Sequence, residues 1–210
     1  FFEDLGIGVY QGYGLTEAAP VVSMNSPGRN RAGSVGRPVP GTVVRIGVDG
    51  EILVRGPGVM LGYWNDVAAT HEAVDTEGWL HTGDLGRLDP DGYLFVTGRA
   101  KSLIVLDSGK KVQPEEVEAI LSQGELFDEV CVVGWRGASG GELVCAVVVP
   151  ALPPMSDEQA ADEVRRLSAP LSGFKRPTIV RVHQGELPKT AKRSLRRAEV
   201  VRLLEERAGR

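Results

Sequence analysis

The chain has 210 residues, of which 42% are hydrophobic and 25% charged, and its formal net charge is −4 at pH 7. This composition is that of a folded globular protein of one or two domains and excludes a disordered chain. Its apolar runs, such as Val144 to Pro150, are far shorter than the roughly 20 residues that cross a bilayer. Acidic residues within positions 1–10 also exclude the cationic start of a signal peptide. We therefore expect a cytoplasmic protein without an integral membrane segment.

Positive charge is concentrated in the C-terminal part of the sequence. Residues 175–210 contain 11 Lys and Arg against 4 Asp and Glu, whereas residues 1–174 contain 13 against 24. A nucleic-acid-binding surface would interleave aromatic side chains with the basic ones, but Phe174 is the last aromatic residue of the chain. We expect no nucleic-acid partner. The cations then belong to a solvated helix face or contact the phosphates of a small ligand.

The first half of the sequence is typical of short strands separated by turns. Gly, Pro and Asp-Gly pairs divide it into short segments rich in β-branched and other apolar residues. DPDG at Asp89 to Gly92 favours a hairpin between the last two of these segments. The predicted strands are Thr42 to Ile46, Glu51 to Arg55, Gly83 to Leu88 and Tyr93 to Thr97.

After Gly98 the sequence alternates between helical and strand patterns. A helix over Gln113 to Leu121 has Pro114 near its start and apolar residues at helical spacing. The elements predicted after it are strands at Glu129 to Trp135 and Leu143 to Val149, a helix near Asp157 to Ala169, a strand at Thr178 to His183 and a helix near Leu195 to Glu206. The fold class is therefore α+β, with a β-rich part at residues 1–98 and a small α+β domain at residues 99–210.

Both cysteines lie in apolar runs that look like buried strands. Cys131 occurs in EVCVVGW and Cys145 in LVCAVVV, and neither has a His or Cys nearby in sequence that would complete a metal site. We expect two core thiols, rather than a disulfide or a reactive site.

Several motifs follow one another in a fixed order. They are GYGLTE at Gly12 to Glu17, GEILVRGPGVMLGYW at Gly50 to Trp64, GWLHTGDLG at Gly78 to Gly86, GR at Gly98 to Arg99 and GKKVQPEEVE at Gly109 to Glu118. Together they resemble the motif series of the adenylate-forming (AMP-binding) superfamily, which includes acyl-CoA synthetases, luciferases and the adenylation domains of peptide synthetases. The resemblance covers nearly the whole chain.

This resemblance implies a domain organisation. Residues 1–98 would be the β-rich C-terminal part of the large AMP-binding domain, and residues 99–210 the small mobile C-terminal lid domain. The family's phosphate-binding loop and most of its large domain would lie upstream of Phe1. We therefore expect this chain to be the C-terminal part of a longer enzyme and to be inactive alone.

The resemblance also assigns nucleotide contacts to GYGLTE. Tyr13 would pack its ring on adenine, the Thr16 hydroxyl and nearby backbone would bind the α-phosphate, and Glu17 would reach Mg²⁺. Gly12 and Gly14 would let the backbone approach the nucleotide closely. The alternative is a glycine-bracketed turn with Thr16 or Glu17 near a helix N-terminus.

Two further contacts follow from the later motifs. Asp84 of TGD matches the ribose-binding aspartate of the family, and Arg99 fits a second contact to ribose or phosphate. The alternatives are a turn cap for Asp84 and a surface ion pair for Arg99. His81 precedes TGD without a recognisable partner in the sequence, and we do not expect it to act as a base.

The resemblance implies domain motion about Lys101, two residues after the arginine of GR. The alternative is a surface lysine before a strand. Gly109 matches a glycine that lies beside the pantetheine tunnel in CoA-forming relatives, although a plain turn explains it equally well.

The sequence departs from the family near its end, where relatives carry a lysine in a pattern like PxTxxGK. Aligning PKT at 188–190 places Arg193 at the glycine and Ser194 at the lysine. Lys192 is the expected substitute because it is nearer to this position than Lys189, and a solvated basic loop is the alternative.

The function implied by the resemblance is an ATP-dependent carboxylic acid–CoA ligase acting through an acyl-adenylate, with a fatty acid favoured and ATP, Mg²⁺ and coenzyme A as cofactors. Coenzyme A is favoured over a carrier protein because the interval between Gly36 and Gly50 is short, whereas acyl-AMP ligases carry an extra segment there. An acyl-AMP ligase that loads a carrier protein is one alternative. The other is an adenylate-binding pseudoenzyme or regulatory module, which Ser194 supports. The acyl chain and the oligomeric state are not specified by the sequence.

Overall fold

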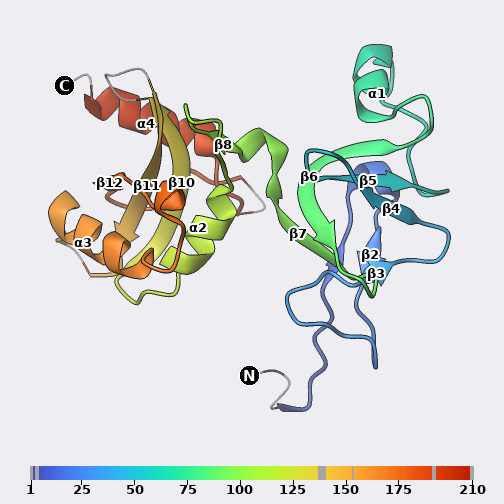
Figure 1. Cartoon of the computed structure of the whole chain (residues 1–210), viewed down its shortest axis with the longest axis horizontal. Helices are drawn as coiled ribbons and strands as arrows, with labels where there is room; N and C mark the ends of the chain where they lie inside the picture. Colours follow the sequence, from blue (N-terminus) through green and yellow to red (C-terminus); the bar gives the residue numbers. More distant parts are fainter. Residues whose placement is uncertain (1, 3–4, 137–140, 153, 191–192, 209–210) are drawn as a thin grey trace. The chain divides into compact units, whose positions relative to one another are not determined.

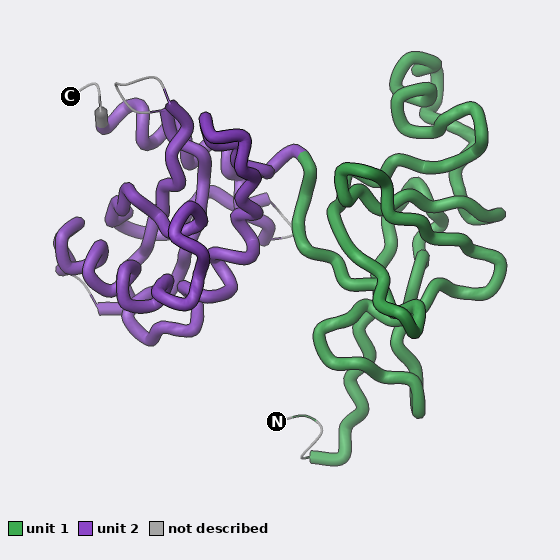
Figure 2. Tube along the Cα trace, viewed as in Figure 1, with its two compact units in different colours: residues 1–100 green, residues 101–210 purple. Residues whose placement is uncertain are grey.

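The computed structural model describes residues 2, 5–136, 141–152, 154–190 and 193–208. The chain divides into two compact units, residues 1–100 and residues 101–210 (Figure 2). The predicted domain boundary, between residues 98 and 99, lies two residues earlier. Within the described residues, no helix is long and apolar enough to cross a membrane.

The first unit is built on an antiparallel sheet of four strands in chain order (Figure 1). These strands are β4 (Val43–Ile46), β5 (Glu51–Arg55), β6 (Leu80–Leu88) and β7 (Leu94–Arg99). A smaller antiparallel sheet contains β1 (Gly12–Tyr13), β2 (Ser23–Met24) and β3 (Arg37–Pro38). The core between them is formed by Ala18, Val22, Ile52, Val54, Leu80 and Leu94.

The hairpin predicted from DPDG is present. Leu88 of β6 pairs with Leu94 of β7, and the Asp89 carboxylate accepts the backbone N–H groups of Asp91 and Tyr93. This use of an aspartate side chain to satisfy the turn backbone is what makes Asp a turn residue. The four strands predicted in this half are all present, with ends within a few residues of the predicted ones.

One helix of this unit was not predicted. Helix α1 (Val67–Ala73) begins after Asp66, whose carboxylate accepts the N–H of Ala69 at 2.9 Å. None of its residues is buried, so it lacks the apolar stripe from which a helix is recognised in sequence.

The second unit is a sheet of three strands with helices on both faces (Figure 1). Strand β10 (Phe127–Arg136) pairs antiparallel with β11 (Glu142–Pro150), and β12 (Ile179–Val182) runs parallel to β11. A short hairpin of β8 (Ile104–Val105) and β9 (Lys111–Val112) precedes them. A turn of 3₁₀ helix, Gly173–Lys175, leads into β12.

Alternate residues of the central strands face opposite cores. Val132, Ala146 and Val148 are buried with α2 (Pro114–Leu121) and α3 (Asp157–Leu167). The intervening residues of β10 and β11, among them Cys131 and Cys145, are buried with Val200 and Leu204 of α4 (Arg197–Ala208). This period of two explains why β10 and β11 read as continuous apolar runs: both of their faces are covered.

The helix ends follow local capping chemistry. Pro114 occupies the first turn of α2, and α3 begins with a capping box in which Ser156 and Gln159 satisfy each other's backbone N–H groups. Helix α4 begins two residues later than predicted, since Leu195 forms an isolated β-bridge with Lys189 instead.

Both cysteines are free and fully buried, as predicted for core thiols. Burial is the main cause that raises the pKa of Cys131 to about 12, and burial raises that of Cys145 to about 12 as well. Both side chains are therefore protonated at neutral pH.

We expect the native protein to resist a thiol reagent that attacks thiolates. A rise of the pKa from 9.0 to about 12 lowers the thiolate fraction at pH 8 by about a thousandfold. Dithionitrobenzoate should therefore modify neither thiol on the timescale on which it modifies both in 6 M guanidinium chloride. Rapid release of thionitrobenzoate from the native protein would contradict this burial.

Candidate functional site

Three of the predicted nucleotide contacts meet at one carboxylate in the first unit. Asp84 on β6 pairs in register with Arg99 at the end of β7, and the Arg99 Nε donates to Asp84 Oδ1 at 2.7 Å. The Tyr13 hydroxyl, from β1, donates to Asp84 Oδ2 at 2.7 Å. Asp84 is only 6% exposed. The fold thus brings together residues that are 15 and 71 positions apart in sequence.

The arrangement keeps acceptor capacity at Asp84. Each carboxylate oxygen has two lone-pair directions, and one donor is observed at each oxygen. Burial is the largest cause that raises the pKa of Tyr13, and the hydrogen bond to Asp84 raises it further. Tyr13 is therefore a neutral donor, and its hydroxyl holds the ring in one orientation. Arg99 thus forms an ion pair, but with the buried Asp84 and not the surface ion pair named as its alternative.

A bulge in β6 sets the position of Asp84. His81 of β6 pairs with Leu53 of β5, and Leu85 of β6 pairs with Glu51 of β5. Three residues of β6, 82–84, therefore lie opposite one residue of β5, Ile52. The Thr82 hydroxyl donates to the carbonyl of that residue, Ile52, at 2.7 Å. Gly83 has φ of 68°, in the region that favours glycine.

Glu51 holds this bulge from the neighbouring strand. Its Oε1 accepts the backbone N–H of Gly83 at 2.9 Å, and its Oε2 lies 2.9 Å from Nδ1 of His81. The other ring nitrogen of His81 lies 3.8 Å from Asp75 Oδ2. His81, for which the sequence indicated no partner, thus lies between two carboxylates. Through its contact with Glu51, His81 supports the bulge. The sequence does not indicate this role of His81 and Glu51, because the two residues lie on neighbouring strands.

The metal ligand predicted at Glu17 lies in a 3₁₀ turn, Thr16–Ala18, which corresponds to the alternative foreseen for Thr16 and Glu17. The hydroxyl of Tyr63 donates to Glu17 Oε1 at 2.9 Å, and this bond is the main cause that raises the pKa of Tyr63. Among the described residues no group of three or more His, Cys, Asp or Glu could hold a metal. A lone carboxylate fits Mg²⁺, which takes its other ligands from phosphate and water.

Contacts within the chain explain Gly14 of GYGLTE and leave little room for a side chain at Gly12. A Cβ on Gly14 would lie 1.7 Å from the carbonyl oxygen of Pro20, and one on Gly12 would lie 3.1 Å from that of Ser23. Gly14 is therefore required by the packing of its own loop, whether or not a nucleotide lies beside it.

Lys101 and Gly109, the sites predicted at the domain boundary and in the second unit, both lie in short turns. Lys101 is exposed in a 3₁₀ turn, Ala100–Ser102, at the division between the two units. Gly109 has φ of 75° in the turn between β8 and β9, and a Cβ there would meet no atom within 4 Å. The turn alone accounts for Gly109. Its place beside a pantetheine tunnel stays a prediction.

Lys192 lies outside the described residues, but its neighbours are informative. Arg193 has φ of 62°, a conformation that favours glycine, and its N–H donates to the Thr190 carbonyl at 2.8 Å. The backbone therefore agrees with the alignment of Arg193 on the family's glycine and of Ser194 on its lysine. Lys189 is engaged elsewhere, since its Nζ lies 2.6 Å from Glu129 Oε1.

Comparisons with known proteins match both units. The profile of the AMP-binding enzyme family matches residues 1–64, and that of the AMP-binding enzyme C-terminal domain matches residues 116–193.

Individual relatives extend the match over most of the chain. An indoleacetate–CoA ligase of Aromatoleum aromaticum is 39% identical over 211 aligned residues, which cover 95% of this chain and 40% of the relative. A long-chain-fatty-acid–CoA ligase of Escherichia coli O157:H7 is 40% identical over 191 residues, which cover 86% of this chain and 33% of the relative. The chain thus spans well under half the length of these curated relatives.

Solved structures show the same fold. The o-succinylbenzoate CoA synthetase of Bacillus subtilis in complex with its acyl-adenylate intermediate has a TM-score of 0.82 at 31% identity, with 95% of this chain and 42% of that one covered. ATP-bound MatB of Rhodopseudomonas palustris has a TM-score of 0.82 at 30% identity, with 94% and 41% covered.

We expect Glu51 to be required for the geometry around Asp84. In the 210-residue chain, Glu51→Ala removes the acceptor of the Gly83 N–H and should lower the free energy of unfolding by about 1–3 kcal/mol. It should also accelerate hydrogen exchange of the Gly83 amide. Glu51→Gln keeps an acceptor and should lose less.

The matched control is Glu72→Ala, which removes an exposed carboxylate from α1. Urea unfolding followed by tryptophan fluorescence gives the stabilities, and NMR gives the exchange rates. Equal stability and equal Gly83 exchange in Glu51→Ala and Glu72→Ala would refute the role of Glu51.

Proposed function

Because this chain belongs to the AMP-binding enzyme family, we propose that it is part of an ATP-dependent acid–CoA ligase that acts through an acyl-adenylate, with a fatty acid as the favoured substrate. The observation that carries the proposal is the convergence of Tyr13 and Arg99 on the buried carboxylate of Asp84. The proposal requires the upstream part that the relatives possess, in a longer polypeptide called the full-length protein below.

In this proposal Asp84 is the ribose anchor. Its carboxylate is held by two donors and keeps lone pairs for the vicinal hydroxyls of a ribose. Arg99 has 65% of its side chain exposed, so its guanidinium can contact ribose or phosphate while Nε stays on Asp84. Tyr13, fixed by its hydroxyl bond, offers its ring to adenine.

The phosphate and metal contacts come from the neighbouring turn. Thr16 supplies a hydroxyl to the α-phosphate, and Glu17 keeps Oε2 for Mg²⁺ while Oε1 accepts from Tyr63. When bound, Mg²⁺ neutralises phosphate charge during attack of the substrate carboxylate. A related o-succinylbenzoate CoA synthetase has been solved with ATP and a magnesium ion, which supports this part of the proposal.

The choice of a fatty acid as substrate and of coenzyme A as acceptor is based on the relatives. Long-chain-fatty-acid–CoA ligases are 40% identical to the chain, and they favour a fatty acid as substrate and coenzyme A as acceptor. Other relatives act on indoleacetate, o-succinylbenzoate or anthranilate, so a panel of acids is needed in any assay.

The main test is acyl-CoA formation by the full-length protein with ATP, Mg²⁺, coenzyme A and a panel that includes palmitate and indoleacetate. Asp84→Ala should lower kcat/KM for ATP at least tenfold, because a hydrogen bond to a charged group contributes about 1.5–3 kcal/mol. Glu72→Ala is the matched control and should retain activity. Absence of acyl-CoA with every acid, or full activity of Asp84→Ala, would refute the proposal.

Lys101 is proposed as the hinge between adenylation and thioester formation. It is exposed in a turn at the division between the two units, the kind of position at which a hinge absorbs a backbone change. Lys101→Pro fixes φ, and in the full-length protein it should impair thioester formation from supplied acyl-adenylate more than adenylate formation. Lys101→Ala is the control. Equal losses in the two half-reactions would contradict a hinge.

Lys192 is proposed to replace the family's lysine. Its ammonium would stabilise charge between carboxylate and α-phosphate, an interaction of about 3 kcal/mol, so Lys192→Ala should slow adenylation about a hundredfold. ATP binding should change little. A single-turnover rate within about threefold of the unmodified protein would contradict the role of Lys192.

The second candidate function is an adenylate-binding module without adenylation, favoured by Ser194 at the lysine position. In that case the full-length protein binds ATP but turns over no acid, Lys192→Ala changes nothing, and Ser194→Lys raises the adenylation rate. Because the positive φ of Arg193 supports this alignment, Ser194→Lys is the substitution that best distinguishes the two functions.

A further inference from the structure

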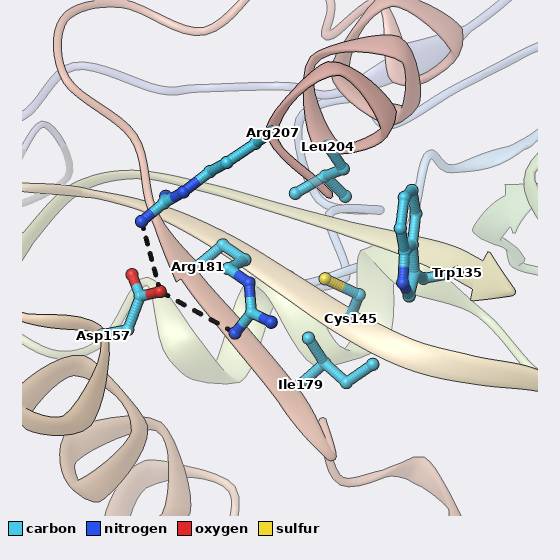
Figure 3. A pocket seen from close by; sticks show the side chains of 7 residues that line it. All are labelled: Trp135, Cys145, Asp157, Ile179, Arg181, Leu204 and Arg207. Atoms are coloured by element: carbon cyan, nitrogen blue, oxygen red, sulfur yellow. Dashed lines mark hydrogen bonds and ion pairs between the residues drawn. The ribbon is translucent and has the colours of Figure 1, made fainter. Parts of the chain in front are cut away.

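A hollow of about 370 Å³ lies in the second unit, on the sheet face that packs against α4 (Figure 3). None of its lining residues is among those assigned to the nucleotide, since all of them belong to β10, β11, β12, α3 and α4. Its volume is near the lower end of ligand pockets, which are about 300–1,000 Å³.

One part of the hollow is apolar. Cys145 and Ile179 come from neighbouring strands, and Leu204 lies on α4. The indole of Trp135 forms one side, as Figure 3 shows. A flat apolar group of one or two rings is complementary to this surface, because an indole stacks well on another aromatic ring.

The opposite part carries two guanidinium groups and one carboxylate. Asp157 Oδ1 is used by the backbone N–H of Val182 at 2.8 Å, which leaves Oδ2 for both arginines. Arg207 Nη2 lies 3.3 Å and Arg181 Nη1 lies 3.7 Å from this oxygen. Figure 3 shows both contacts converging on Asp157.

This pairing leaves a positive charge uncompensated. Charge-assisted N–H···O bonds are usually about 2.7–2.9 Å long, and both arginine contacts are longer. Two guanidinium charges against one carboxylate give the lining residues a net charge of +1. The side chains of Arg181 and Arg207 are 45% and 55% exposed, so their N–H groups are accessible to an anion.

We propose that this hollow binds a small aromatic carboxylate. Nη1 of Arg181 donates to the Val180 carbonyl at 2.9 Å and Nη1 of Arg207 to the Val182 carbonyl at 2.8 Å, so the ligand carboxylate pairs with the remaining N–H groups of the two arginines. Its ring lies on Ile179 and Leu204 against Trp135. The bound anion competes with Asp157 for the arginines. Since Arg181 lies on β12 and Arg207 in the last turn of α4, the ligand ties the helix to the sheet.

The experiment uses the 210-residue chain, sodium 2-naphthoate as the probe and neutral 2-naphthamide as its matched control. The chain has three tryptophans, and Trp135 is the one in the second unit, so ¹⁵N-resolved indole N–H signals report the site separately. Trp135→Phe assigns the signal. The Trp135 signal should shift saturably with 2-naphthoate, and the amide should bind at least fivefold more weakly.

Substitutions with opposite expected effects on 2-naphthoate binding make the test specific. Arg181→Gln and Arg207→Gln should each weaken 2-naphthoate binding at least fivefold, whereas Asp157→Asn, which keeps an acceptor for the Val182 N–H, should strengthen it at least twofold. Arg165→Gln, which removes an exposed guanidinium from α3, should leave binding unchanged.

Three outcomes would overturn the proposal: no saturable shift of Trp135, equal binding of the amide, or weaker binding by a folded Asp157→Asn variant. Amide signals of β10 to β12 show whether each variant is folded. If Asp157→Asn does not fold, the two arginine variants and the amide control decide the result.

Discussion

The candidate site depends on the burial of one carboxylate, Asp84. A carboxylate that is 6% exposed must be compensated by donors, since an unpaired buried charge costs several kcal/mol. Tyr13 and Arg99 supply those donors at 2.7 Å, and in doing so they tie β1 and β7 to β6. The same contacts that stabilise the first unit therefore hold the three side chains proposed to bind the nucleotide in fixed positions. This is the preorganisation that a binding site requires.

The elements with a strong local signal could be predicted, and those that depend on cross-strand register could not. DPDG indicated the β6–β7 hairpin because the Asp89 carboxylate satisfies the turn backbone locally. The contact of Glu51 with Gly83 spans 32 residues and depends on a bulge that no local pattern encodes. For the same reason His81 appeared without a partner. Helix α1 was missed because none of its residues is buried, which removes the apolar periodicity.

Motif glycines illustrate how a family pattern and a local constraint coincide. Gly14 was predicted beside the nucleotide, but its Cβ position is already filled by the carbonyl of Pro20. Gly109 needs only its turn conformation. Arg193 is the converse case, a bulky residue with positive φ at the position where the family pattern predicts glycine. Such a conformation costs about 1 kcal/mol or more for a residue with a Cβ, so the surrounding loop and not the residue itself determines it.

Several of the cations near the C-terminus form ion pairs within the second unit. Lys175 pairs with Glu116, Lys189 with Glu129, and Arg197 with Glu115 and Glu118, so the terminal segment is held to α2 and β10 by ion pairs. At Arg197 two carboxylates share one guanidinium, and burial, the largest cause, raises the pKa of Glu118. Asp157 has the opposite stoichiometry, one carboxylate for two guanidinium groups. Among the described residues, this stoichiometry places excess positive charge at a concave surface, where it can attract an anion.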